Sequence, residues 1–185
     1  MNPRVSKRPN ILLVMTDQQR ADHLGCYGNP IVRTPHLDAL ASEGLQFSNF
    51  YSSPFCSPTR AMLLTGVDHH RAGFGAMKEV IEPEQIGRPG YETHLNDRVA
   101  ALPETLRSAG YRTYLSGKWH LGRGEDTSPA ARGFEPSWGL IDGSSSHFDQ
   151  VATASSDPDS MPLALYRDDG REMQLPETGF YSSEA

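Results

Sequence analysis

The chain has 185 residues, enough for one domain-sized core. Its net charge of -6 argues against a general nucleic-acid binder, because such proteins carry a basic surface. Hydrophobic residues make up 37%, and no stretch approaches the roughly 20 apolar residues of a membrane span, so we expect neither nucleic acid nor membrane as a partner. The 17 glycines and 14 prolines predict many turns and long loops.

The first third of the chain predicts a strand, a helix and a second strand. The apolar run 11–15 is short and unbroken and ends at polar residues, as expected of a parallel strand covered on both faces. Thr34 is a predicted helix N-cap, and Gly44 is the predicted stop. Residues 45–51 predict the second strand. This order is typical of α/β proteins.

The second half repeats part of this plan. A helix is predicted over residues 102–109, followed by a strand over 111–115. Residues 76–98 are rich in Glu, Gly and Pro and predict a surface excursion without regular structure. Residues 163–175, with Asp169-Gly170 at their middle, predict a β-hairpin. The expected fold class is α/β, with a mostly parallel central sheet flanked by helices.

Cys56 stands immediately before a predicted helix. Pro58 is typical of a first helical turn, and Gly66 is typical of a helix end. Free backbone N–H groups at a helix N-terminus stabilise negative charge, and Arg60 adds a fixed cation one turn further along. The pattern favours a thiolate or an oxyanion here. The alternative is a small buried hydrophobic residue, the usual role of an isolated cysteine.

Asp17 and Gln18 follow the first predicted strand. Adjacent carboxylate and amide oxygens at the carboxyl end of a strand suit a hard cation such as Ca²⁺ or Mg²⁺. The alternative is a turn with a capping aspartate.

Lys118 and His120 flank Trp119 after the later strand. In an extended stretch, residues two apart point the same way, so a cation and a proton-transfer group would share one face. The alternative is an exposed lysine beside a histidine that belongs to the core. The pair His69-His70 predicts a loop rather than a metal site, because adjacent side chains rarely converge on one ion.

Several motifs together resemble those of the sulfatase family. The string Cys56-x-Pro58-x-Arg60, followed by Leu64-Thr65-Gly66, is similar to the sulfatase signature. Further sulfatase-like motifs occur in the same order along the chain as in the family: Asp17 and the segments 34–41, 117–122 and 132–134. The segments 65–73, 90–96 and 179–183 are similar to bacterial arylsulfatases in particular.

The resemblance implies an alkaline-phosphatase-like (sulfatase) fold and a sulfuric-ester hydrolase of arylsulfatase type. It implies that Cys56 is oxidised to formylglycine by a formylglycine-generating enzyme, and that the hydrated aldehyde is the nucleophile toward a small sulfate ester. Asp17, Gln18 and position 56 would then be metal ligands, with Ca²⁺ expected and Mg²⁺ or another divalent cation as the alternative. Lys118 would bind the sulfate together with Arg60, and His120 would hydrogen-bond the formylglycine hydroxyl.

Gln18 departs from the family pattern, and the chain ends at Ala185; each leaves an alternative function open. Many family members carry a second aspartate where this chain has Gln18, and Asp-Gln pairs also occur in phosphonate monoester or phosphodiester hydrolases of the same superfamily. Residues 1–185 are expected to be the N-terminal portion of a sulfatase catalytic domain, inactive alone because further ligands lie beyond Ala185. A non-catalytic remnant is the second alternative. Met1 to Pro9 shows no signal peptide, which predicts a cytoplasmic chain, with the periplasm as the alternative.

Overall fold

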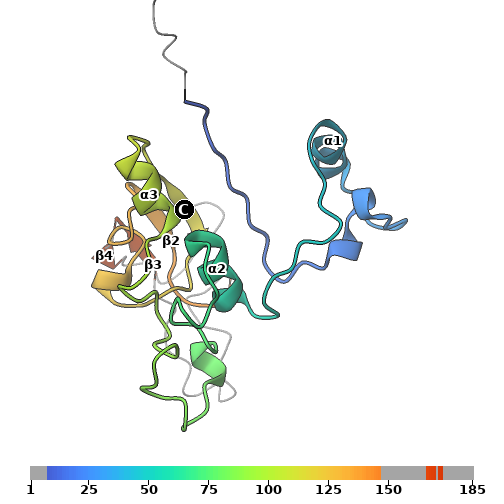
Figure 1. Cartoon of the computed structure of the whole chain (residues 1–185). Coiled ribbons are helices and arrows are strands. Elements are labelled where there is room, and N and C mark those ends of the chain that lie inside the picture. The colour runs from blue at the N-terminus through green and yellow to red at the C-terminus, as the bar shows by residue number, and fades with distance from the viewer. Residues whose placement is uncertain (1–7, 147–165, 170, 173–185) are drawn as a thin grey trace, which may run out of the picture. The chain divides into compact units, whose positions relative to one another are not determined.

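The computed structural model describes residues 8–146, 166–169 and 171–172 (Figure 1). The chain divides into two compact units, Met1–Phe50 and Tyr51–Ala185. Each unit has its own short helices, and the sheet belongs to the second. No helix in the described ranges combines the length and apolar character needed to cross a membrane.

The first unit is built around one α-helix. Its helical elements are η1 (Ala21–His23), η2 (Gly25–Tyr27) and α1 (Pro35–Glu43). The predicted helix is confirmed, with Thr34 at the N-cap position, but the Thr34 hydroxyl does not cap the helix. It donates to Asp38 Oδ1 at 2.9 Å and accepts from the Gly25 N–H at 2.8 Å. Thr34 therefore ties η2 to α1.

The two strands predicted in this unit are wrong for the described structure. Residues 11–15 and 45–51 have no strand assignment, and Leu12 and Leu45 are 88% and 89% exposed. A strand exists only where a neighbour completes its ladder of hydrogen bonds. Among the described residues no segment pairs with either run, so their apolar character alone does not make them strands.

The second unit holds a four-stranded sheet in the order β1-β2-β3-β4. The strands are β1 (Leu115–Lys118), β2 (Ser137–Leu140), β3 (Tyr166–Asp168) and β4 (Arg171–Glu172). β1 and β2 are parallel, and the β2–β3 and β3–β4 pairs are antiparallel. β1 begins at Leu115, four residues after the start of the strand predicted over 111–115. The predicted hairpin is confirmed where it is described, and the rest of 163–175 lies outside the described residues.

The two α-helices of this unit lie close to their predicted positions, and the unit also holds two short 3₁₀-helices that the sequence does not predict. They are α2 (Cys56–Thr65), η3 (Lys78–Val80), α3 (Leu102–Ser108) and η4 (Glu125–Thr127). Within α3, Glu104 Oε2 accepts a hydrogen bond from the Ala101 N–H at 2.5 Å, which satisfies one donor at the start of the helix. Residues 76–98 consist mostly of turns and bends, as predicted for a surface excursion, but they also contain the short helix η3, and Leu95 and Asn96 at their end are buried.

The core includes residues of the loop that follows β1. Its buried residues are Ala61, Ala72, Phe74, Leu95, Trp119, Leu121 and Ile141. The Trp119 indole Nε1–H donates to Thr127 O at 3.0 Å, so even this apolar residue has its polar group paired. Trp119 N–H donates to Leu140 O at 2.7 Å, and His120 N–H donates to Ile141 O at 3.1 Å. The parallel pairing thus continues past both strands and fixes the backbone of His120.

Close packing of β1 and β2 requires a glycine at one register position. Gly117 is paired with Gly139, and a Cβ on Gly139 would lie 1.8 Å from the Gly117 carbonyl oxygen. The obstacle is backbone rather than a flexible side chain, so any other residue would push the strands apart. This contact lies near the ends of both strands, from which the loop residues 119–120 and 141–143 continue.

Candidate active site

Cys56 is the first residue of α2, one position further into the helix than the sequence predicts. The preceding residue, Phe55, is extended, with φ −115° and ψ 151°. Thr59 holds this bend, because its N–H donates to Phe55 O at 3.1 Å and its hydroxyl donates to Ser53 O at 2.7 Å. Cys56 is therefore half-buried at a fixed helix start, while Ser57 behind it is fully buried.

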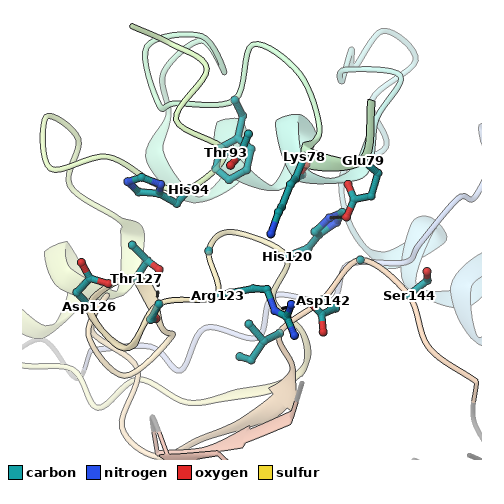
Figure 2. A pocket seen from close by; sticks show the side chains of 16 residues that line it. Lys78, Glu79, Thr93, His94, His120, Arg123, Asp126, Thr127, Asp142 and Ser144 are labelled. Carbon is teal, nitrogen blue, oxygen red and sulfur yellow. Dashed lines mark hydrogen bonds and ion pairs between the residues drawn. The ribbon is translucent and has the colours of Figure 1, made fainter. Parts of the chain in front are cut away.

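His120 connects Cys56 to an acidic residue. Its Nδ1 lies 3.2 Å from Cys56 Sγ. Its Nε2 lies 3.3 Å from Glu79 Oε1, and Figure 2 shows these two side chains facing each other. The residue has φ +57°, a left-handed conformation that is uncommon outside glycine. Such backbone strain is found most often at functional sites. Simple strand alternation thus does not orient His120, because its backbone has left the extended conformation.

A glycine lies against the His120 ring. A Cβ on Gly143 would come within 2.6 Å of the ring carbon Cε1 and 2.7 Å of Nε2. The side chain of His120 is 10% exposed. The ring is therefore confined by Gly143 on one side while both of its nitrogens have partners.

Cys56, His120 and Glu79 each favour the charged form of the neighbour they contact. Burial opposes ionisation of the Cys56 thiol, but its hydrogen bond with His120 and the charges of His120 and Lys118 together lower its pKa. Burial also opposes charge on His120, but hydrogen bonds to Cys56 and Glu79 raise its pKa. The hydrogen bond with His120 is the main cause of the lowered pKa of Glu79. The arrangement favours an anion at position 56 beside an imidazolium.

Arg60 and Lys118 complete the group of predicted residues in this unit. The buried guanidinium of Arg60 donates through Nη1 to the backbone oxygen of Lys118 at 2.7 Å. This bond ties α2 to the end of β1. The structure therefore brings together Cys56, Arg60, Lys118 and His120, which come from one helix and from one strand with the loop after it.

Asp17 and Gln18 belong to the first unit, where both are exposed. Gln18 has φ +52°, a second non-glycine residue in the left-handed region. One carboxylate and one amide oxygen from adjacent residues form a donor set that fits a hard divalent cation. The donor chemistry and the unusual backbone at Gln18 are therefore compatible with the predicted metal role.

Glu79 is the residue of the site that the sequence does not identify. It lies in η3, inside the stretch predicted to have no regular structure. Met77, two residues earlier, places its Sδ 3.5 Å from Cys56 Sγ. No local pattern links Met77 or Glu79 to Cys56, because the contact depends on a loop that returns over the helix start.

A cavity of about 570 Å³ opens beside His120. Its lining includes both acidic and basic side chains (Figure 2): Lys78, Glu79, His94, Arg123, Asp126 and Asp142. Arg123 Nε lies 3.0 Å from Asp142 Oδ1, and the side chain of Lys78 extends into the cavity. The lining also includes the apolar Phe74 and Ile141, so the cavity suits a ligand that has hydroxyl groups as well as an apolar face.

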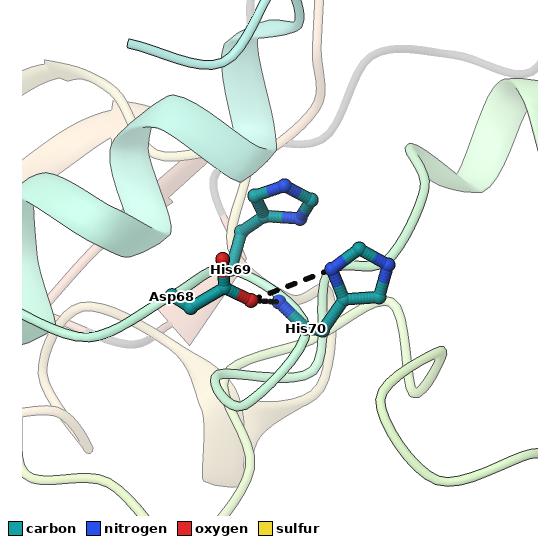
Figure 3. Close-up of side chains that lie close together, drawn as sticks. All are labelled: Asp68, His69 and His70. Carbon is teal, nitrogen blue, oxygen red and sulfur yellow. Dashed lines mark hydrogen bonds and ion pairs between the residues drawn. The ribbon is translucent and has the colours of Figure 1, made fainter. Parts of the chain in front are cut away.

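Asp68, His69 and His70 form a second polar cluster, with one potential ligand atom from each lying within 4.8 Å of the others (Figure 3). The contacts of the cluster are local. His69 Nδ1 is 2.6 Å from Phe74 O, and the His70 backbone N–H donates to Asp68 Oδ1 at 2.9 Å. These bonds shape the turn that leads to the core residue Phe74, which is consistent with the predicted loop role.

Comparisons with known proteins agree with the motifs. Residues 9–166 match the Sulfatase family model. An uncharacterized sulfatase of Schizosaccharomyces pombe is 47% identical, covering 77% of this chain and 26% of the relative. The arylsulfatase of Klebsiella aerogenes is 37% identical, covering 97% of this chain and 37% of the relative. The chain thus spans about a quarter to a third of the length of these relatives.

Solved structures give the fold. BT4656, determined in complex with its substrate D-glucosamine-2-N,6-O-disulfate, superimposes with a TM-score of 0.65 at 28% identity. The superposition covers 94% of this chain and 28% of that protein. The architecture is alkaline-phosphatase-like, and this chain corresponds to only part of the fold of that longer protein. The match over residues 9–166, together with the site around Cys56, shows that this chain belongs to the sulfatase family.

Proposed function

We propose that the polypeptide carrying these residues is a sulfuric-ester hydrolase of arylsulfatase type, with formylglycine made from Cys56 as its nucleophile. The observation that carries the proposal is the 3.2 Å contact between Cys56 Sγ and His120 Nδ1, within the family's signature sequence. The charge of Lys118 acts on the same position, and Arg60, one helical turn further along, is bound to the Lys118 backbone oxygen. Residues 1–185 form the N-terminal portion of the catalytic domain in this proposal.

The nucleophile arises by modification of Cys56. A formylglycine-generating enzyme converts the Cys56 side chain to an aldehyde: an external oxidant removes two electrons, the C–S bond breaks and the sulfur leaves as sulfide. Water then adds to the aldehyde to give two hydroxyl groups. One hydroxyl then occupies the region of the present Sγ atom, within hydrogen-bonding reach of His120 Nδ1. The start of α2 and the nearby cations favour developing negative charge on these oxygens.

Hydrolysis follows in two steps at position 56. One hydroxyl oxygen forms a bond to the sulfur of the ester, and the S–O bond to the alcohol breaks, so that the alcohol leaves with a proton. His120 then accepts the proton of the remaining hydroxyl, the aldehyde C=O re-forms, and the C–O bond to sulfate breaks. Lys118 and Arg60 offset the charge of the sulfuryl group throughout.

Asp17, Gln18 and the formylglycine oxygen would hold the divalent cation, expected to be Ca²⁺. When bound, the cation supplies positive charge that polarises the oxygens it contacts. The carboxylate and amide donors support a hard cation over a soft one.

The substrate class proposed is a small sulfate ester of an aromatic or sugar alcohol. One relative is an arylsulfatase, and BT4656 acts on a sulfated glucosamine. The polar cavity next to His120 supports a leaving group that carries hydroxyls. Gln18, in place of a second aspartate, supports a phosphonate monoester or phosphodiester hydrolase as the second candidate.

The test uses the complete gene product, made in cells with a formylglycine-generating enzyme. Peptide mass spectrometry should find the aldehyde at position 56, and the protein should cleave p-nitrophenyl sulfate faster than phenylphosphonate monoesters. Cys56→Ala should abolish the activity, whereas Cys26→Ala, which changes the other cysteine within residues 1–185, should retain it. An active protein with unmodified Cys56 would refute the nucleophile, and a preference for phosphonate would favour the second candidate.

A further inference from the structure

We infer that Glu79 is a positioning residue for His120: its carboxylate holds the Nε2–H of the ring, so that Nδ1 faces position 56. This inference rests on the proposed function, because it assigns His120 a partner in that reaction. It concerns a residue that lies outside the signature segments and comes from the loop over the start of α2.

The contacts at the two ring nitrogens carry the inference. Nδ1 is 3.2 Å from Cys56 Sγ, and Nε2 is 3.3 Å from Glu79 Oε1. Both contacts are made in one ring orientation. Turning the ring over would place carbon atoms where the nitrogens now lie and would lose both contacts. Glu79 therefore selects the orientation that the reaction uses.

The surroundings leave the ring little freedom to find another partner. The His120 side chain is 10% exposed, and the Glu79 side chain is 30% exposed, so the contact between them is sheltered from bulk water. Gly143 lies close to the ring at Cε1 and Nε2. Met77, in the same segment as Glu79, is 3.5 Å from Cys56 Sγ. One short segment thus packs against both the nucleophile position and its base.

The chemistry of a carboxylate explains why Glu79 would set the tautomer. A neutral imidazole carries one N–H, and an ionised carboxylate can only accept a hydrogen bond. The proton therefore resides on Nε2, and the Nδ1 lone pair is left to accept a proton from the hydroxyl at position 56. The negative charge also stabilises the imidazolium that forms after this transfer.

Kinetics of Glu79 variants test the role in the complete gene product. Glu79→Ala should lower kcat for p-nitrophenyl sulfate about 10–100-fold, as loss of an orienting partner does elsewhere, with little change in KM. Glu79→Gln should lose less, because its amide oxygen still accepts from Nε2–H. Glu84→Ala, an exposed glutamate of the same segment, is the matched control and should match wild type. An unchanged kcat in Glu79→Ala would overturn the inference, as would equal losses in kcat and in folded yield.

Nitrogen NMR of histidine-labelled protein gives a readout that does not depend on turnover. In wild type the neutral ring of His120 should be protonated at Nε2, and in Glu79→Ala the Nδ1-protonated form should gain population. If the wild type cleaves no sulfate ester while this shift is seen, the proposed function fails and the positioning stands. If the wild type is active and Glu79→Ala leaves the tautomer unchanged, the positioning is overturned and the function stands.

Discussion

His120 Nδ1 lies 3.2 Å from Cys56 Sγ, although 64 residues separate the two in the chain. Two independent features create this contact. The start of α2 fixes Cys56, and the parallel pairing that continues beyond β1 fixes His120 through its backbone bond to Ile141. The contact therefore depends on the packing of the helix against the strand ends and not on either motif alone.

Gly143→Ala should disturb this contact while leaving the fold largely intact. A Cβ at this position would lie 2.6 Å from the His120 ring, which is too close, so the ring must move. Since displacement of a reacting group by about 1 Å can cost on the order of 100-fold in rate, we expect a large loss of kcat. Urea unfolding should show a change of less than about 1.5 kcal/mol, because the clash is with a side chain rather than with backbone. Wild-type kcat in Gly143→Ala would show that the ring position is not critical.

Much of the second unit could be predicted from local signals. Pro58 and Gly66 mark the ends of α2, and the signature residues Cys56 and Arg60 lie on the first turns of that helix. Glu79 could not be predicted, because its partner His120 is 41 residues away and residues 76–98, to which Glu79 belongs, have no periodic pattern. Local sequence predicts elements, whereas a side-chain partner across a loop depends on tertiary packing.

In the first unit the helix could be predicted from the sequence, but the strands could not. Residues 11–15 have the composition of a buried strand, yet Leu12 is 88% exposed and the run has no described strand beside it. The helix α1 could be predicted because its hydrogen bonds are internal to the segment. The backbone hydrogen bonds of a strand are made with a neighbouring strand, and the sequence of one segment does not specify that neighbour.

Arg132→Met should destabilise the second unit strongly. The buried guanidinium donates to three backbone oxygens, those of Leu95, Asn96 and Val99, and to Glu104 Oε2 at 3.2 Å. Methionine fills similar space but leaves these acceptors unpaired, so we expect a loss of about 3 kcal/mol in the free energy of unfolding.

The control for this variant is a second arginine–glutamate pair. Arg107 and Glu135 lie 3.0 Å apart with side chains 44% and 63% exposed, so Arg107→Met should cost less than about 1 kcal/mol. Urea denaturation followed by circular dichroism measures both variants. Equal losses would mean that the buried carbonyl contacts of Arg132 add nothing beyond a surface ion pair.

Acid should weaken the loop around Glu92. Partial burial alone would raise the pKa of Glu92, but hydrogen bonds from Arg98 and from the backbone, including Gly90 N–H, lower it. The folded pKa therefore lies below the unfolded value of about 4.3, so the ionised carboxylate stabilises the fold above that pH. The stabilisation is lost as pH falls through the folded pKa.

The size of this effect is limited by exposure. Arg98 is 56% exposed, so the contribution should be below about 1 kcal/mol. Glu92→Gln should be less stable than wild type near neutral pH, and the difference should shrink as the pH is lowered toward about 3. Unfolding midpoints in urea measured across this range test the sign. A difference that grows toward acid would contradict it.

Removing the metal and changing Gln18 should reveal how residues 17 and 18 hold it. Treatment of the complete gene product with EDTA should abolish sulfate-ester hydrolysis, and Ca²⁺ should restore it. Gln18→Asp adds a second carboxylate to the donor set, and each added charge strengthens the attraction to a divalent cation. The left-handed backbone at Gln18 does not oppose this change, because aspartate adopts positive φ more readily than most residues.

We therefore expect Gln18→Asp to bind Ca²⁺ on the order of tenfold more tightly in calorimetry of the EDTA-treated protein. Gln19→Asp adds the same charge one residue later, and it is the control for a general electrostatic effect. If both variants tighten binding equally, the charge acts at long range and Gln18 is not a ligand. If only Gln18→Asp does so, the side chain at position 18 contacts the cation. Residues 1–185 alone should bind Ca²⁺ weakly, because the proposed ligands Asp17, Gln18 and position 56 would supply only part of the 6–8 oxygen ligands that the ion takes.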